Sequence, residues 1–197
     1  MVRAVLRLSA FSLFGLSVWA ASPQAARAQA FEERLPLCLT CHGEKGQSET
    51  PEIPSLGAQP PMYVLIQLYM FRENLRQALP MNDMAAGLSD ADLQRFGDTM
   101  NKLPAPPPAG TPDPAQAQQA RALIGAHQCG SCHNADFSGT ESVPRLAGQR
   151  EDYLLNSLRG YKNGTRIEYQ PVMAEVVRPL KDEDFVVLAH YLARTGK

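Results

Sequence analysis

Two copies of the pattern Cys-Xaa-Xaa-Cys-His carry the chemistry of this 197-residue chain, and together they contain all four of its cysteines. Two thiols three positions apart, followed at once by an imidazole, form the attachment signature of a c-type haem. The thiols add to the haem vinyl groups, and the histidine supplies an axial nitrogen to the iron. The motifs therefore predict two covalently bound haem c groups. The predicted haem attachment points and axial imidazoles are Cys38, Cys41, His42, Cys129, Cys132 and His133.

Two other kinds of site contain paired cysteines. A structural zinc site would use two Cys-Xaa-Xaa-Cys pairs, but it gives no reason for a histidine directly after each pair. A thiol redox motif is expected within a βαβ pattern, which neither motif has. Both alternatives are weaker than haem attachment.

The motifs belong to an internal repeat. The segment 54–59 returns as 144–149, with Pro, Leu and Gln at an offset of 90 residues. Downstream, Leu88 matches Leu180 at an offset of 92, so the first copy lacks two residues. Two further pairs keep the offset of 90: Tyr63 with Tyr153, and Arg76 with Arg166.

Each repeat has the pattern of helices, and no stretch alternates with the period of a strand. Pro60 and Pro61 suit a helix start, and Ser89 with Asp92 resembles a capping box. Further helices are expected over about 115–127, from about 151 to a stop at Asn163-Gly164, and from near residue 182. Pro36 is expected to interrupt the short segment before the first motif. The sequence therefore predicts an all-α protein.

The sixth iron position calls for a second ligand, and a methionine thioether is the usual choice in small c-type cytochromes. Met173 lies 40 residues after His133 and 7 before Leu180. Met81 lies 39 residues after His42 and 7 before Leu88, so it is the predicted counterpart. Met84 is the alternative to Met81, and the other methionines of the repeats are expected to be packing residues: Met62, Met70 and Met100.

Other repeated residues suggest support for the haems. A ligating imidazole normally donates its second N–H to a carbonyl or carboxylate, and Pro54 and Pro144 follow the histidines by 12 and 11 residues. Their carbonyls are the predicted acceptors, although each proline could simply punctuate a loop. Arg76 and Arg166 would either pair with haem propionates or remain solvated at the surface.

A proline-rich stretch separates the repeats. Residues 104–114 contain six prolines, which cannot continue a helix and predict a stiff, extended connector. The predicted domains are 31–103 and 115–197. The first contains six basic and ten acidic residues, and the second contains ten and nine. This balance excludes a basic nucleic-acid footprint and allows a dipole that orients against a charged redox partner.

Residues 1–30 have the features of a secretory signal peptide. Arg3 and Arg7 precede an apolar stretch, and small-residue cleavage sites follow, with cleavage expected after Ala30. An uncleaved membrane anchor is the alternative. Export agrees with the motifs, because c-type haems are attached outside the cytoplasm. The predicted location is the periplasm.

The pattern resembles the dihaem cytochrome c4 family over about residues 37–192. The resemblance rests on the doubled haem motif, the Pro-Xaa-Leu-Xaa-Xaa-Gln segments, and a methionine seven positions before a leucine that opens the last helix. It implies two tandem class I cytochrome c domains with His/Met ligation of both haems. It also implies periplasmic electron transfer, often toward a terminal oxidase.

Two kinds of function remain open. The chain is expected to be an electron carrier, not an enzyme, and to connect a quinol-oxidising complex or a dehydrogenase with a terminal acceptor such as an oxidase. The alternative is a cytochrome subunit of a periplasmic dehydrogenase complex. A dihaem peroxidase would need an open iron position, and the methionine assignments argue against it.

Overall fold

The computed structural model describes residues 23–167, 169 and 171–196, with residues 23–30 described by their backbone alone. Nine helices lie in this part of the chain, and its only bridge of β type joins Thr140 and Val143. The helices are α1 (Pro23–His42), α2 (Pro61–Arg72), α3 (Met81–Ala85), α4 (Asp90–Lys102), α5 (Pro114–Ala126), α6 (Gly130–His133), α7 (Glu151–Asn163), α8 (Val172–Val177) and α9 (Asp182–Ala193). The all-α prediction is therefore confirmed for the described residues.

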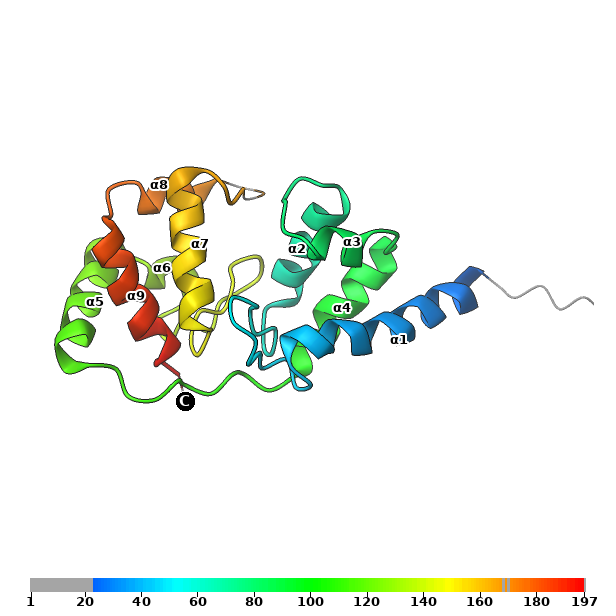
Figure 1. Ribbon diagram of the computed structural model, residues 1–197, viewed down its shortest axis with the longest axis horizontal. Coiled ribbons are helices and arrows are strands. Elements are labelled where there is room, and N and C mark those ends of the chain that lie inside the picture. The colour runs from blue at the N-terminus through cyan, green and yellow to red at the C-terminus, as the bar shows by residue number, and fades with distance from the viewer. Residues whose placement is uncertain (1–22, 168, 170, 197) are drawn as a thin grey trace, which may run out of the picture.

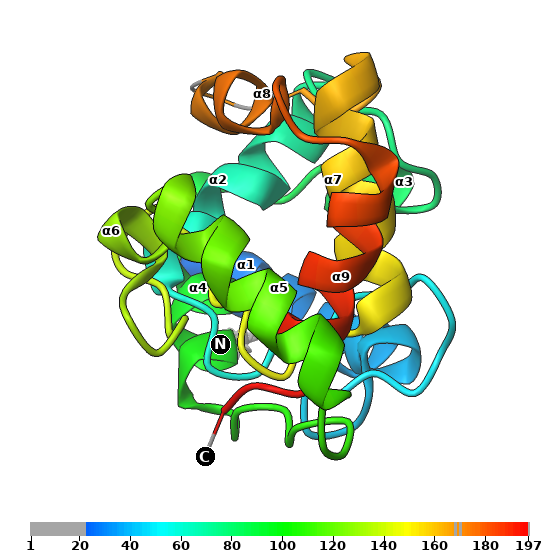
Figure 2. The same cartoon turned by 90° about the vertical axis from the view of Figure 1, so that its left-hand side faces the viewer.

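The helices form two lobes that follow the two repeats. Helices α1 to α4 make one lobe, α5 to α9 make the other, and the connector runs along the lower edge of both (Figure 1). Viewed from the end of the second lobe, α5, α7 and α9 stand in front of the first lobe (Figure 2). The two halves of the sequence thus fold as tandem domains.

The core of the first lobe lies where α2 and α1 cross α4. Phe96 of α4 is 1% exposed, and its ring centroid lies 4.6 Å from that of Phe31 on α1. Gly97 lets the helices approach closely, because a Cβ at this position would lie 2.6 Å from the Pro61 carbonyl oxygen. This close packing holds α2 and α4 at a fixed separation.

The core of the second lobe is built around α9, which packs against α5 and α7. Its apolar residues divide into two buried clusters. One cluster contains Phe137, Leu154 and Leu192, and the other contains Val177, Phe185 and Leu188. Helix α9 contributes to both clusters and is therefore the central element of this lobe.

Several predicted helix ends are present. Ser89 caps α4, where its hydroxyl accepts from the Asp92 N–H and the Asp92 carboxylate accepts from the Ser89 N–H at 2.9 Å. Pro61 opens α2, and Gly164 ends α7 in the left-handed conformation. These ends are local features, which explains why short sequence patterns predict them.

Two sequence expectations are wrong. Helix α1 continues through Pro36, because the rest of the lobe holds the helical turn that precedes the proline. Phe31 packs on Phe96, and Arg34 donates to the Met84 carbonyl at 2.7 Å. Met62 is 47% exposed and so is not a packing residue, whereas Met70 and Met100 are buried as expected.

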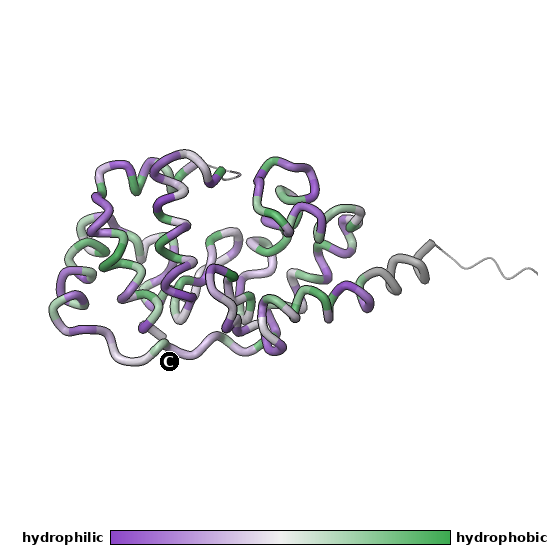
Figure 3. Tube along the Cα trace, in the orientation of Figure 1, coloured by the Kyte–Doolittle hydropathy of each residue, from purple (hydrophilic) through white to green (hydrophobic). Residues whose placement is uncertain are grey.

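The connector after α4 is fastened to both lobes. The Gln47 side chain donates to the Ala105 carbonyl at 2.8 Å in the first lobe, and the Ala109 N–H donates to the Ala193 carbonyl at 2.9 Å in the second. Much of the connector is pale in the hydropathy colouring, without a strongly hydrophobic run (Figure 3). The connector is thus an extended surface segment that is bonded to both lobes. Pro114, the last residue of the predicted connector, already begins α5.

The predicted signal segment lies largely outside the described residues, and α1 begins at Pro23. In the described parts of the chain, no helix combines the length and apolar character needed to cross a membrane.

Candidate haem sites

Both haem motifs lie at the ends of helices. The first closes the long α1, so Cys38 and Cys41 are one helical turn apart and His42 is the last helical residue. In the second motif, Cys129 caps the short helix α6, and His133 ends that helix. A spacing of three residues puts both thiols of a motif on one side of a helix, as a doubly attached planar group requires.

Each motif histidine is held by a carbonyl oxygen. Nδ1 of His42 lies 2.7 Å from the Pro54 carbonyl oxygen, and Nδ1 of His133 lies 2.9 Å from that of Pro144. A carbonyl oxygen can only accept, so Nδ1 must carry the proton in both rings. Each Nε2 is then left with a free lone pair, which is the arrangement an iron ligand needs.

The electrostatics of both histidines favour the same state. Burial lowers the pKa of His42 and of His133, and the hydrogen bonds to Pro54 and Pro144 oppose this shift only in part. Both side chains are therefore neutral imidazoles at physiological pH. Since a metal binds the neutral ring, these residues fit a haem iron.

None of the four cysteines is joined to another in a disulfide. Cys41 and Cys132 are exposed, and Cys38 and Cys129 are partly buried. Across the described ranges, no group of three or more His, Cys, Asp or Glu side chains gathers as a metal cluster. The two cysteine pairs thus remain separate, as haem attachment requires and a shared zinc site would not.

The predicted methionine ligands lie on short helices that the sequence did not predict. Met81 is the first residue of α3, and Met173 is the second residue of α8. Both are partly buried and pack against the apolar core of their lobe. Met84 lies on the same helix as Met81 and is also partly buried. The preference for Met81 therefore stays a prediction.

A buried asparagine beside Met81 was missed by the sequence reasoning. Asn82 is 7% exposed, and its side chain joins three backbone groups at the end of α2 and in the loop that follows. It donates to the carbonyls of Phe71 and Arg76 at 3.0 and 2.8 Å and accepts from the Ala78 N–H at 2.8 Å. Asn82 has no counterpart in the second repeat, so no sequence signal pointed to it.

The repeated arginines and tyrosines meet between the lobes. Arg166 donates to the hydroxyl oxygens of Tyr153 and Tyr63 at 3.0 and 3.3 Å. Its guanidinium also lies over the Tyr153 ring, 5.4 Å from the centroid. Arg76 donates to the Gln67 side chain and lies over the Phe71 ring. The sequence paired these residues by offset, but only the fold brings Tyr63 to Arg166.

Two arginines and two tyrosines share this region between the lobes. Desolvation by burial would raise the pKa of Tyr153, but Arg166 and Arg76 outweigh it and lower that pKa to about 7. The pKa of Tyr63 is raised, mainly by burial and by the neighbouring Tyr153. The arginines that favour a phenolate at Tyr153 would also favour a nearby carboxylate, such as a haem propionate.

Two helical lobes, each with a thiol pair, a neutral histidine and a core methionine, define a tandem c-type cytochrome. The chain belongs to the cytochrome c4 family, and it carries two covalently bound haem c groups. The cytochrome c family pattern matches residues 117–196.

Relatives and solved structures agree with this assignment. The chain is 30% identical to cytochrome c4 of Thiocapsa roseopersicina, over 88% of this chain and 95% of that protein. It is 32% identical to the thiosulfate dehydrogenase electron acceptor of Stutzerimonas stutzeri, over 81% and 79%. The crystal structure of reduced cytochrome c4 from Pseudomonas stutzeri superposes with a TM-score of 0.77 at 27% identity, covering 86% of this chain and 98% of that one.

Proposed function

We propose that this dihaem electron carrier works in the periplasm, with His42 and Met81 ligating one iron and His133 and Met173 the other. When bound, the haems supply reversible one-electron exchange at the iron. The observation that carries the proposal is the hydrogen bond from each Nδ1 to a proline carbonyl, found in both repeats. It holds each ring in one tautomer and directs Nε2 away from the proline carbonyl.

Further parts of the proposal concern the chain's own organisation. The domains are residues 31–103 and 115–197, connected by residues 104–114, after removal of a signal peptide that ends near Ala30. Arg76 and Arg166 would neutralise propionates between the lobes. Pro54 and Pro144 would orient the axial rings.

The partners are redox proteins. A relative that covers most of the chain is named as the electron acceptor of thiosulfate dehydrogenase, which supports a dehydrogenase as donor. A quinol-oxidising complex is a further candidate donor, and an oxidase is the proposed acceptor. The same name also supports the second candidate function, a cytochrome subunit held in a periplasmic dehydrogenase complex.

A redox titration of the purified protein, followed by visible absorption, tests the carrier function. Two reversible one-electron steps and the weak far-red band of methionine-ligated ferric haem are expected. A reduced protein in which either haem binds carbon monoxide would show an open iron position and contradict the proposal. Co-purification of the native protein with a dehydrogenase at fixed stoichiometry would favour the subunit over the free carrier.

A further inference from the structure

Two buried glutamines, one in each lobe, bind the backbone of the opposite lobe in the same way. Gln149 is 3% exposed, and its Oε1 accepts from the Ser55 N–H at 2.8 Å while its Nε2 donates to the Ser55 carbonyl at 2.9 Å. Gln59 is 4% exposed and makes the same pair of bonds to Arg145, each at 3.0 Å. The partners Ser55 and Arg145 are themselves repeat equivalents at the offset of 90.

The contact between Gln149 and Ser55 is directly linked to the first motif histidine. The Ser55 N–H belongs to the same peptide unit as the Pro54 carbonyl, which accepts from Nδ1 of His42. One planar amide therefore accepts a hydrogen bond from His42 at its oxygen and donates one to Gln149 from its nitrogen. The resonance of the peptide bond couples these two ends.

The second lobe repeats the arrangement. The Arg145 N–H, which donates to Gln59 Oε1, shares its peptide unit with the Pro144 carbonyl, the acceptor for Nδ1 of His133. Each motif histidine is thus connected through a single amide to a glutamine of the other domain.

We infer that Gln149 is a positioning residue for His42 and that Gln59 is one for His133, so that each domain adjusts the axial histidine of its neighbour. This inference rests on the proposed ligation of iron by the two histidines. Linked hydrogen bonds polarise one another, so the glutamine acceptor makes the proline carbonyl a stronger acceptor for Nδ1–H. A stronger bond at Nδ1 raises the basicity of the ligand, which favours ferric iron.

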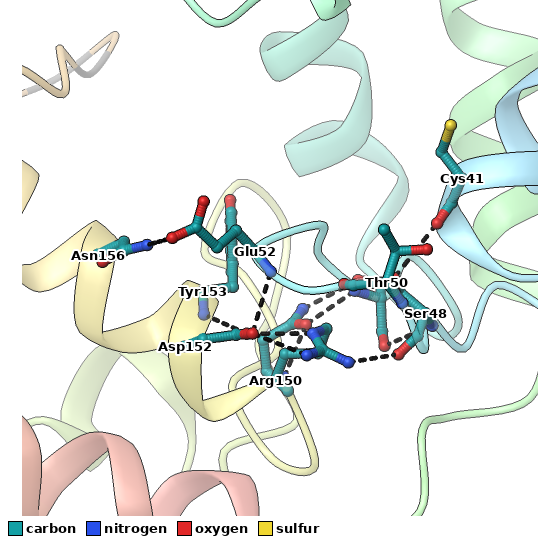
Figure 4. Close-up of polar contacts among 10 residues, drawn as sticks. Cys41, Ser48, Thr50, Glu52, Arg150, Asp152, Tyr153 and Asn156 are labelled. Carbon is teal, nitrogen blue, oxygen red and sulfur yellow. Dashed lines mark hydrogen bonds and ion pairs between the residues drawn. The ribbon is translucent and has the colours of Figure 1, made fainter.

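The glutamines also fix the orientation of the amide. Gln149 bonds both the N–H and the carbonyl oxygen of Ser55, which holds this backbone segment against the second lobe. A neighbouring polar network reinforces the contact. Arg150 donates to the Ser48 carbonyl at 3.3 Å, and the Asp152 carboxylate accepts from the Glu52 N–H at 3.0 Å (Figure 4). The loop that carries Pro54 is thus held from the second lobe.

The test uses the full-length holoprotein with the substitutions Gln149→Met and Gln59→Met, which keep side-chain length but remove both bonds. Asn156→Ala is the matched control. Asn156 donates to the Glu52 carboxylate at 3.0 Å, also between the two lobes, but it contacts neither the glutamines nor the amides that they bond. One readout is the proton shift of each axial Nδ1–H in the reduced protein labelled with ¹⁵N-histidine. The other is the reduction potential of each haem, with each haem assigned by NOE contacts to its own domain.

The expected result is a crossed pattern. Gln149→Met moves the His42 Nδ1–H signal upfield and raises the potential of the first haem, and Gln59→Met does the same to His133 and the second haem. Asn156→Ala leaves both signals in place. Equal shifts at both haems, a shift only in the substituted domain, or no shift would overturn the inference. A wild-type protein without two reversible haem steps would instead refute the proposed function.

Discussion

The side-chain amide of Asn82 donates to the main-chain carbonyl of Arg76 at 2.8 Å. This bond links the residue next to Met81 with the arginine proposed to face a propionate. The loop between α2 and α3 therefore uses one buried polar contact to place two side chains that are proposed to contact the haem. The second lobe lacks an equivalent asparagine, and Val177 and Met173 of its methionine helix pack in an apolar cluster.

Replacing Asn82 with Ala should loosen the Met81 loop. The substitution leaves buried backbone groups without partners, at a cost of about 1–3 kcal/mol. We expect the first haem to lose its far-red band at a lower denaturant concentration than the second haem. Asn156→Ala, at an exposed position, should leave the band unchanged. A loss of equal size from both haems would contradict a local role.

The two methionines of α3 can be distinguished directly. Met81→Ala should abolish the first haem's share of the far-red band and lower its potential, because the thioether favours reduced iron. Met84→Ala should preserve the band, because Met81 remains the ligand. Arg34 still bonds the main-chain carbonyl at position 84, so α3 keeps its place. Visible spectra of the two oxidised variants decide the matter. Loss of the band from Met84→Ala alone would show that the repeat alignment is wrong at this point.

Arg166→Gln should lower the potential of a haem whose propionate it faces. Removing a partly buried positive charge makes the ferric state easier to form, by roughly 1–2 kcal/mol for a charge about 10 Å away at an effective dielectric constant of about 20. Arg159→Gln is the control, because Arg159 pairs with Asp182 at the surface. Potentiometry at matched ionic strength measures both. A similar shift of the potential in the two variants would mean that the effect comes from the net charge of the protein and not from a contact between Arg166 and a propionate.

Gly97→Ala should destabilise the first lobe. Its new Cβ would meet the Pro61 carbonyl at 2.6 Å, and such overpacking costs about 1–3 kcal/mol. Gly125→Ala is a matched helical control, since nothing lies within 4 Å of its Cβ position. That change should be neutral or stabilise by about 0.5–1 kcal/mol. Chemical unfolding measures both, and equal stabilities would disprove the close packing of α2 on α4.

The sequence by itself determined the haem chemistry and most of the helices. Covalent attachment needs Cys-Xaa-Xaa-Cys-His in consecutive positions, and caps such as Ser89 with Asp92 act within one helical turn. The repeat offset also selected residues that the fold later brings together, including the tyrosine and arginine pairs. These features can be predicted because they depend on residues that are close in sequence or that recur in both repeats.

Only the tertiary structure decided how the two halves meet. The bond between Gln149 and Ser55 joins residues 94 positions apart. The side chain of Asn82 bonds main-chain atoms, which every residue type possesses. Pro36 stays helical because Phe31 and Arg34 are held by the rest of the lobe. Gln59 and Gln149 are repeat equivalents in the sequence, but a backbone amide can belong to any residue type, so the sequence does not show which amide each glutamine contacts.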